Sequence, residues 1–220
     1  LDVVSPEELF SDYVYVSGTS AVFRDHFARY ASEVTQRYPL TTKELVVDIG
    51  SNDGTLLRCF QSLDCRVLGV DPARDIAQQA TEGGIETING FFTPALAGEI
   101  REQHGAAALV TANNVFAHID NLAAVAEGVR VLLAPGGVFV FEVSYLVDVL
   151  EKTLFDTIYH EHLSYHSVGP LARFFEANGM ELIGADRVDS HGGSLRGFVQ
   201  LKGGAHPVAK SVNERLAEEE

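Results

Sequence analysis

From Leu45 onward, short apolar runs alternate with amphipathic segments, and this alternation limits the possible folds more than any other feature of the chain. Runs such as "LVVDIG", "RVLGVD" and "VFVFEV" are apolar on both faces, as strands buried on both sides of a sheet must be. The segments between them, for example "ARDIAQQATEGG", carry apolar residues at helical spacing. Strands that alternate with helices predict a parallel sheet covered on both faces, which is a doubly wound α/β domain.

The two ends of the chain depart from this rhythm. Residues 7–38 carry apolar residues at roughly helical spacing interrupted by "SGTS", which predicts two helical pieces forming a lid or flank. After the long α/β segment, "PLARFFEANGM" predicts a helix ended by Gly179, and the strands that follow predict an antiparallel hairpin at the sheet edge. We therefore expect a lid over 1–40, a cofactor-binding domain over 41–202 and the start of a C-terminal segment over 203–220, whose acidic tail forms a solvated helix face.

Composition excludes several classes of partner. Asp and Glu number 31 against 16 Lys and Arg, giving a formal charge of −15, and without a basic run we expect no binding to nucleic acid. No segment approaches the roughly 18 apolar residues of a membrane helix, and no secretory signal opens the chain. Two cysteines are too few for a disulfide framework, so we expect reduced thiols and a cytoplasmic location. The oligomeric state is left open.

The glycine-rich stretch "DIGSNDGT" follows the first predicted strand, where the next helix must begin. Glycines at such a corner allow a tight turn and a close backbone approach by a ligand. The next strand ends at Asp71, 21 residues after Gly50, where a carboxylate can accept hydrogen bonds from ribose hydroxyls. A glycine loop combined with this acidic residue predicts a cofactor that contains adenosine.

Two cofactors fit that pattern, a dinucleotide and S-adenosylmethionine. A pyrophosphate favours a loop rich in backbone donors, whereas Asp48, Asn52 and Asp53 crowd this loop, and carboxylates suit a sulfonium and an ammonium group better. The "LLAPGG" before the fifth strand and the edge hairpin also resemble class I methyltransferases, which have a Rossmann-like sheet. An NAD-dependent enzyme or a binding module without chemistry is the rival from another class.

The predicted cofactor residues are Asp48, Gly50, Ser51, Asn52, Asp53, Gly54, Asp71, Pro72, Asn113 and Asn114. The last two follow the fourth strand, at the sheet edge where ligands bind in such folds. Asn113 and Asn114 could hold the adenine or the amino-acid end of the cofactor, and helix capping by asparagine is the alternative.

The stretch "YHEHLSYHS", from Tyr159 to Ser167, holds three of the eight histidines in the chain. His160 and His162 are two apart, while His162 and His166 are four apart, so no single strand or helix aligns all three. The stretch also lacks the helical H-E-x-x-H spacing of a zinc protease. Acid–base catalysis, a structural hydrogen-bond cluster and a metal site on irregular backbone are the three interpretations.

Blocks spread over nearly the whole chain resemble one family, the S-adenosylmethionine-dependent sugar C-methyltransferases of deoxysugar and antibiotic biosynthesis. The matching blocks are "DYVYVSGTS", "DIGSNDGTLL", "GVDPA", "NGFF", "ANNVFAHIDNL", "FEVSYLVD", "FDTIYHEHLSYHS" and "HGGSLRG". The resemblance implies a doubly wound class I methyltransferase fold and methyl transfer to carbon 3 of a nucleotide-linked 4-keto deoxysugar. This small-molecule nucleotide sugar is the expected partner.

In that family the residues matching Tyr159, Glu161, His162 and His118 line the sugar site, and the resemblance implies that His162 is the base. It also implies a site tyrosine at Tyr13 or Tyr15. Removing a proton from carbon 3 gives an enolate, which needs a base and a donor facing the developing oxyanion. Tyr159 and His118 are candidates for that donor, and Glu161 for orienting the sugar or raising the basicity of His162.

The "HGGSLR" stretch offers two further substrate residues. His191 and Arg196 surround a glycine turn, and Arg196 could pair with a nucleotide diphosphate. A hairpin turn followed by a strand arginine is the structural alternative.

The chain departs from the family in two places. It shows no counterpart of the family's N-terminal zinc module or of most of the C-terminal domain, so we expect no metal. An O- or N-methyltransferase of the same fold, which needs no base cluster, is the alternative function.

Overall fold

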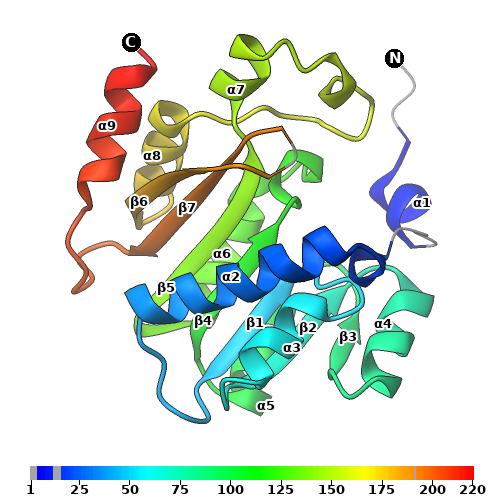
Figure 1. Ribbon diagram of the computed structural model, residues 1–220. Coiled ribbons are helices and arrows are strands. Elements are labelled where there is room, and N and C mark those ends of the chain that lie inside the picture. The colour runs from blue at the N-terminus through cyan, green and yellow to red at the C-terminus, as the bar shows by residue number, and fades with distance from the viewer. Residues whose placement is uncertain (1–3, 12–15, 191) are drawn as a thin grey trace. The chain divides into compact units, whose positions relative to one another are not determined.

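The computed structural model describes residues 4–11, 16–190 and 192–220, and these divide into two compact units, Leu1–Phe92 and Thr93–Glu220. The first unit contains α1 (Pro6–Phe10), the 3-10 helix η1 (Ser17–Thr19), α2 (Ala21–Arg37), β1 (Leu45–Ile49), α3 (Thr55–Gln61), β2 (Arg66–Asp71), α4 (Arg74–Glu82) and β3 (Thr87–Asn89) (Figure 1). Its strands are parallel and stand in the order β3-β2-β1.

The second unit contains α5 (Pro94–His104), β4 (Ala107–Asn113), η2 (Phe116–His118), α6 (Leu122–Leu132), β5 (Leu133–Ser144), α7 (Leu146–Glu151), η3 (Phe155–Thr157), α8 (Val168–Ala177), β6 (Met180–Val188), β7 (Ser194–Leu201) and α9 (Lys210–Glu218). Its strand order is β4-β5-β7-β6, in which β4 and β5 are parallel while β7 pairs antiparallel with both of its neighbours. The predicted parallel strands and antiparallel edge hairpin are therefore confirmed.

Local sequence signals explain where several helices begin and end. Thr93 caps α5 by accepting a hydrogen bond from the Leu96 N–H, and proline follows at the first helical position. Gly179, at φ 72°, ends α8 as predicted, because a residue with a side chain seldom adopts this left-handed conformation. Within the described residues, every helix is too short or too polar to cross a bilayer.

The N-terminal helix α2 is part of the core of the first unit. Its ring at Tyr30 meets Phe60 of α3 edge-on, with centroids 6.5 Å apart, and both side chains are fully buried. Aromatic rings that pack in this way stabilise a helix pair beyond the burial of their area. The prediction of an N-terminal helix is confirmed, while its role as a lid stays a prediction.

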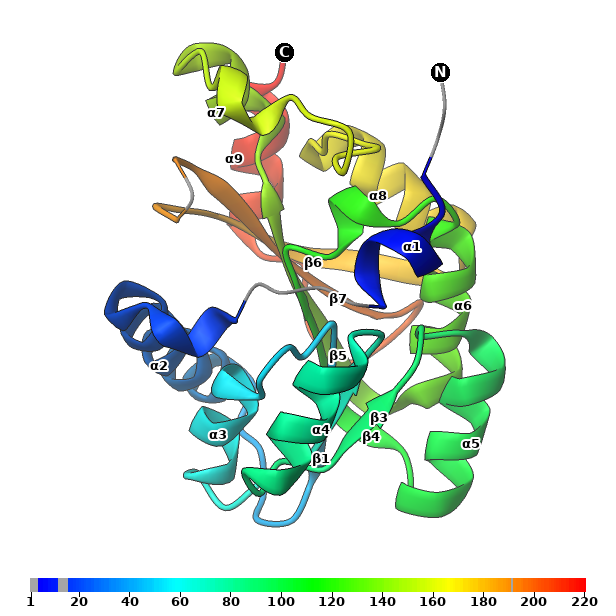
Figure 2. The same ribbon diagram turned by 90° about the vertical axis from the view of Figure 1, so that its right-hand side faces the viewer.

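Four buried phenylalanines form the aromatic core of the second unit. Phe116 of η2 stacks on Phe141 of β5 at 5.2 Å between centroids, and Phe139 and Phe175 surround the pair. A Cβ atom at Gly197 of β7 would overlap the Phe141 ring, so glycine is required at this strand position. These ring contacts fix η2 against β5 and α8. Elsewhere in the second unit, α5 and α6 lie side by side (Figure 2).

Two elements differ from the sequence-based expectation. Strand β5 begins at Leu133, within "LLAPGG", because Leu133 pairs with Ala107 before a register shift. Helix α7 is an element that the sequence did not predict, since six residues are too few to show a helical repeat.

Candidate active site

The glycine loop, residues Gly50–Gly54, follows the fully buried strand β1 in the first unit. Gly50, Asn52 and Gly54 adopt left-handed backbone conformations, with φ of 69°, 51° and 75°. A Cβ atom on Gly54 would lie 2.9 Å from Ile85 Cγ2, so this position needs glycine for its backbone angle and for space. The loop turns the chain tightly at the start of α3, as the sequence predicted for a ligand-binding corner.

Asp71, at the end of β2, is 6% exposed and supports the glycine loop. Its Oδ2 accepts a hydrogen bond from the Asn52 N–H at 2.8 Å, and its Oδ1 accepts one from the Ala73 N–H at 2.8 Å. Burial raises the pKa of Asp71, and the two backbone hydrogen bonds act in the opposite direction. Each carboxylate oxygen can accept a second hydrogen bond, so the predicted contact with ribose hydroxyls stays a prediction.

Unpartnered buried polar atoms test whether these residues suit a cofactor. Ser51 Oγ is buried and has no hydrogen-bond partner among the described residues. In the second unit, Oδ1 and Nδ2 of Asn113, at the end of β4, are likewise buried and unpartnered within that part of the chain. Buried polar groups nearly always have a partner, so these atoms are suited to a polar ligand. Both were predicted cofactor residues.

The other predicted cofactor residues lie where their motifs place them. Asp48 is buried within β1, and Pro72 follows β2. Asn114 adopts φ 55°, and its N–H donates to the Glu142 carbonyl at 2.8 Å. It does not cap α6, because the Asn121 side chain accepts the capping hydrogen bond there.

A second group of predicted residues gathers in the second unit, between η2 and the histidine loop, residues 152–166. The Ala117 carbonyl accepts hydrogen bonds from the Leu163 N–H at 2.7 Å and the Ser164 N–H at 3.3 Å. These bonds hold the loop beside η2, which carries His118. The ring centroids of His118 and His162 consequently lie 5.0 Å apart although the residues are 44 positions apart.

Backbone carbonyls fix the orientation of both rings. His162 Nδ1 lies 2.7 Å from the Thr157 carbonyl oxygen, and His118 Nδ1 lies 2.9 Å from the Glu161 carbonyl oxygen. A carbonyl can only accept, so the neutral His162 ring carries its proton on Nδ1 and its lone pair on Nε2. Burial lowers the pKa of His118, chiefly by disfavouring its charged form. In the neutral His162 ring, Nε2 is therefore the nitrogen that could accept a proton.

Two tyrosines complete this group. The Tyr159 ring lies 4.5 Å from the His162 ring between centroids, and its side chain is 42% exposed. Burial, followed by the charge of Glu161, raises the pKa of Tyr159 and favours its protonated phenol. Tyr165, which sequence reasoning did not select, donates its hydroxyl to the Thr157 carbonyl at 3.0 Å. Its presence in "YHEHLSYHS" was the only signal, and only folding brings it to Thr157.

The other two histidines of "YHEHLSYHS" lie in different surroundings. His160 is exposed, whereas His166 is buried with Nε2 3.1 Å from Ser164 Oγ. Burial lowers the pKa of His166, and a hydrogen bond to the Phe116 backbone acts in the opposite direction. Among the described residues, no three His, Cys, Asp or Glu side chains are placed to hold a metal ion. His162 and His118 form the pair that could act together.

The predicted substrate residues are less well supported. Arg196 is 4% exposed in β7, and its Nε donates to Glu142 Oε1 of β5 at 2.6 Å. This position favours the alternative of a strand arginine, and its pairing with a diphosphate stays a prediction. Tyr13, Tyr15 and His191 lie outside the residues that the structure describes.

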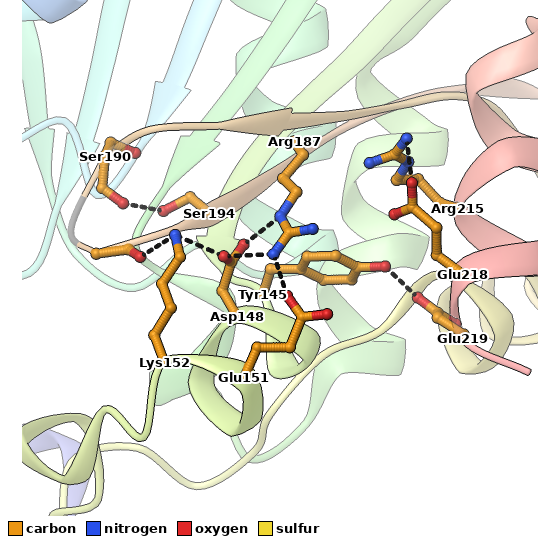
Figure 3. A network of polar contacts seen from close by, with 11 residues as sticks. Tyr145, Asp148, Glu151, Lys152, Arg187, Ser190, Ser194, Arg215, Glu218 and Glu219 are labelled. Atoms are coloured by element: carbon orange, nitrogen blue, oxygen red, sulfur yellow. Dashed lines mark hydrogen bonds and ion pairs between the residues drawn. The ribbon is translucent and has the colours of Figure 1, made fainter.

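The histidine loop is anchored at its base by ion pairs (Figure 3). Asp148 of α7, whose side chain is fully buried, accepts from Arg187 Nε at 2.9 Å and pairs with Lys152 Nζ at 2.6 Å. Burial would raise the pKa of Asp148, but the hydrogen bonds from Arg187 and Lys152 outweigh it and hold the pKa below its usual range. Lys152 Nζ also donates to the Gly192 carbonyl at 2.7 Å, which ties α7 to the hairpin turn.

Glu219 makes a second anchor and corrects the expectation of a solvated acidic tail. Its Oε1 accepts from the Tyr145 hydroxyl at 2.9 Å (Figure 3). Its carboxylate also accepts hydrogen bonds from the N–H groups of Val168 and Gly169. Ser167, at the cap position of α8, makes no capping hydrogen bond with its side chain. Glu219 therefore caps α8 from a distant part of the chain, a pairing that no local pattern reveals.

Comparison with known proteins gives consistent matches. A family model described as a methyltransferase domain matches residues 23–184. The C-methyltransferase NovU of Streptomyces niveus is 42% identical over 217 residues, which cover 99% of this chain and 52% of that protein. The chain thus spans about half the length of this curated relative.

Solved structures of low sequence identity share the fold. A putative methyltransferase in complex with the Haloferax volcanii Trm112 activator is 17% identical, with a TM-score of 0.65 over 84% of this chain and 94% of that one. The magnesium protoporphyrin IX methyltransferase of Synechocystis PCC 6803 with bound S-adenosylhomocysteine is 13% identical, with a TM-score of 0.61 over 81% and 83% of the two chains. The fold is therefore the Rossmann-like α/β fold of class I, as predicted.

Proposed function

Because the chain belongs to the methyltransferase-domain family, which uses S-adenosylmethionine, we propose that it methylates carbon 3 of a nucleotide-linked 4-keto deoxysugar through an enolate. The observation that carries this proposal is the fixed tautomer of His162, whose Nδ1 is bound by the Thr157 carbonyl. Oxygen and nitrogen acceptors already have a lone pair, whereas carbon must first lose a proton. A prepared base beside a second histidine suits methylation at carbon.

The cofactor supplies an electrophilic methyl group on a sulfonium sulfur. We assign its binding to the glycine loop, to Asp48, Asp71 and Pro72, and to Asn113 and Asn114. The unpartnered Ser51 Oγ and Asn113 amide support this assignment, because they offer buried polar atoms to a ligand. Asp71 supports it indirectly by holding the Asn52 backbone.

His162 is the proposed base. The 4-keto group acidifies the hydrogen on carbon 3, and Nε2 of His162 accepts that proton while Nδ1 keeps its bond to Thr157. The bond from Nδ1 stabilises the imidazolium that results, because the carbonyl dipole faces the ring proton. Glu161, whose own carbonyl fixes His118, orients the sugar or raises the basicity of His162.

Tyr159 is the better donor for the developing enolate oxygen. Its raised pKa keeps the phenol protonated, and the ring lies next to that of His162. His118 already donates its Nδ1 proton to the Glu161 carbonyl, so its proposed role is to bind the sugar. Its lowered pKa favours a neutral ring, so His118 places no second cation beside the proposed base.

The similarity to a C-methyltransferase over 99% of the chain supports carbon as the methyl acceptor. That protein is about twice as long, so the sugar and its nucleotide belong to the proposal. An O- or N-methyltransferase is the outcome that the following test would reveal instead.

The test is hydrogen exchange at carbon 3, followed by NMR in deuterated water. The full chain is mixed with S-adenosylhomocysteine and a thymidine-diphosphate 4-keto-2,6-dideoxy sugar. We expect wash-out of the carbon 3 hydrogens that depends on the protein and falls about 100-fold or more in His162→Asn. His160→Asn, which alters an exposed histidine two positions away, is the matched control and should exchange like the wild type.

Two results would contradict the proposal. Unchanged exchange in His162→Asn would exclude His162 as the base. Methyl transfer from S-adenosylmethionine to an oxygen or nitrogen acceptor, with no carbon 3 exchange, would establish the heteroatom alternative.

A further inference from the structure

The turn formed by η1 lies against the glycine loop through two successive backbone groups. The Ser17 N–H donates to Asn52 Oδ1 at 2.9 Å, and the Gly18 N–H donates to Asp53 Oδ2 at 3.0 Å. These partners are 35 residues apart in sequence and all belong to the first unit. Two adjacent peptide groups thus bind two adjacent side chains, so the turn meets the loop in one specific alignment.

The same turn is held from its other side. Arg24 Nη1, from α2, donates to the Gly18 carbonyl at 2.6 Å. A Cβ atom added to Gly18 would overlap Asp53 Oδ2 and lie 2.6 Å from Thr55 Oγ1, so any larger residue would push the turn off the loop. The close approach of turn and loop therefore depends on glycine at position 18.

The two side chains that bind the turn also shape the glycine loop. Asn52 Oδ1 accepts a second hydrogen bond, from the Asp53 N–H at 2.9 Å, while Asp53 Oδ1 accepts from Thr55 N and Oγ1 at 3.2 and 2.7 Å. Asn52 holds a left-handed backbone conformation, which asparagine tolerates better than most residues with a side chain. The hydrogen bond from the turn therefore binds a side chain whose own backbone forms the tight corner of the loop.

We propose that Ser17–Thr19 is a strap that holds the glycine loop in its cofactor-binding conformation, with Asn52 and Asp53 as positioning residues that bind the strap. Asn52 Oδ1 and Asp53 Oδ2 then bind the strap, and this proposal revises the predicted role of the two side chains as direct cofactor ligands. This inference rests on the assignment of the glycine loop to S-adenosylmethionine and is independent of the sugar. Without the strap, the loop populates other conformations. The apparent affinity for the cofactor then falls in proportion to the fraction of molecules whose loop keeps the binding conformation.

The sharpest variant is Ser17→Pro, which removes one backbone donor and leaves both loop side chains in place. Ser17 is the first residue of η1, where proline is accepted, and Val16 before it has the extended backbone that proline requires, with φ −117° and ψ 116°. We expect Ser17→Pro to weaken the binding of S-adenosylhomocysteine about 5- to 10-fold by calorimetry. Gly18→Ala and Asp53→Asn should also weaken the binding of S-adenosylhomocysteine.

A second readout uses the protein without any cofactor. Hydrogen exchange of the amides of residues 50–54 should be faster in Ser17→Pro than in the wild type, because the loop opens more often. A direct ligand role for Asn52 and Asp53 does not predict this change.

Matched controls separate the strap from general effects of each substitution. Lys210→Pro places proline at the first position of α9, after the extended Ala209, and should leave cofactor affinity unchanged. Gly98→Ala, in α5, adds a methyl group to a glycine with open space around it and serves as the control for Gly18→Ala. Circular dichroism confirms that each variant is folded.

Two results would overturn the proposal. If Asp53→Asn weakens binding while Ser17→Pro and Gly18→Ala do not, the side chains act directly on the cofactor. If Ser17→Pro changes neither the affinity nor the amide exchange of the loop, the strap does not hold the glycine loop.

Discussion

His162 Nδ1 lies 2.7 Å from the carbonyl oxygen of Thr157, five residues earlier in the chain. The same oxygen accepts the Tyr165 hydroxyl at 3.0 Å, so both of its lone pairs are used within one short loop. This shared acceptor connects the orientation of the proposed base to a tyrosine that does not contact it by a hydrogen bond.

Removing the Tyr165 hydroxyl should therefore slow the proposed proton transfer without abolishing it. In Tyr165→Phe the Thr157 carbonyl loses one of its two donors, so the loop holds the His162 ring less firmly. We expect the rate of carbon 3 exchange to fall about 5-fold, equivalent to one hydrogen bond of about 1 kcal/mol, with little change in the KM for the sugar. Exchange as fast as in the wild type would show that Tyr165 does not position the base.

Breaking the buried pair of Arg196 and Glu142 should strongly destabilise the protein. Both side chains are nearly inaccessible, at 5% and 2% exposure, so Arg196→Met removes the cation that faces a buried carboxylate in the sheet. We expect a loss of about 3–5 kcal/mol in the free energy of unfolding, measured by urea denaturation. Restoring neutrality with the double variant Glu142→Gln, Arg196→Met should recover part of the loss.

An exposed ion pair provides the comparison. Lys202 and Glu176 lie 3.4 Å apart with side chains 63% and 71% exposed, so Lys202→Met should cost less than about 1 kcal/mol. A stable Arg196→Met variant with a raised KM for the nucleotide sugar would instead support the diphosphate role of Arg196.

Acidification should destabilise the protein partly through His166. Burial holds its pKa below the ordinary value of about 6.5, so the unfolded chain binds more protons than the folded one as the pH falls below that value. The stability that neutral His166 provides is therefore present above about pH 6.5 and lost progressively toward its lower folded pKa.

Urea unfolding at pH 7.5 and 5.5 measures this effect in the wild type and in His166→Asn. The variant should lose less stability over that interval, by at most about 1.4 kcal/mol per pH unit. His118 contributes in the same direction and Asp71, with its raised pKa, in the opposite one, so the difference between the two proteins is the readout. Equal losses would show that His166 does not titrate on unfolding.

Glu219 should stabilise the chain through its cap on α8. Glu219→Ala removes the acceptors of the Tyr145 hydroxyl and of the Val168 and Gly169 N–H groups, at an expected cost of about 1–3 kcal/mol. Glu220→Ala, at the exposed neighbouring position, should change stability by less than about 0.5 kcal/mol. Equal unfolding curves for the two variants would contradict the capping role.

Much of the fold could be predicted because its signals are local. Apolar runs such as 45–49 report burial on both faces, and Gly54 and Gly179 mark turns that need a left-handed backbone. Helix α7 was not predicted because its six residues show no helical repeat. Strand β5 begins before its predicted start because its first residue, Leu133, pairs with Ala107 of β4.

The candidate site was only partly accessible from the sequence. The chain's residue types and their resemblance to a family selected His162, His118 and Tyr159 as an acid–base group. The sequence could not reveal that His166 is buried, that Arg196 pairs with Glu142, or that Asn52 and Asp53 bind the turn at Ser17.

The sequence by itself determined the alternation of strands and helices, the glycine corner and the set of groups able to move a proton. Periodicity and glycine placement act over a few residues, so they can be recognised without knowing the fold. Tertiary structure decided which ring nitrogen of His162 carries the proton. It also decided which carboxylates bind groups of the chain itself, as those of Asp53 and Glu219 do. Those properties depend on hydrogen bonds whose partners meet only after the backbone has folded, and no local pattern encodes them.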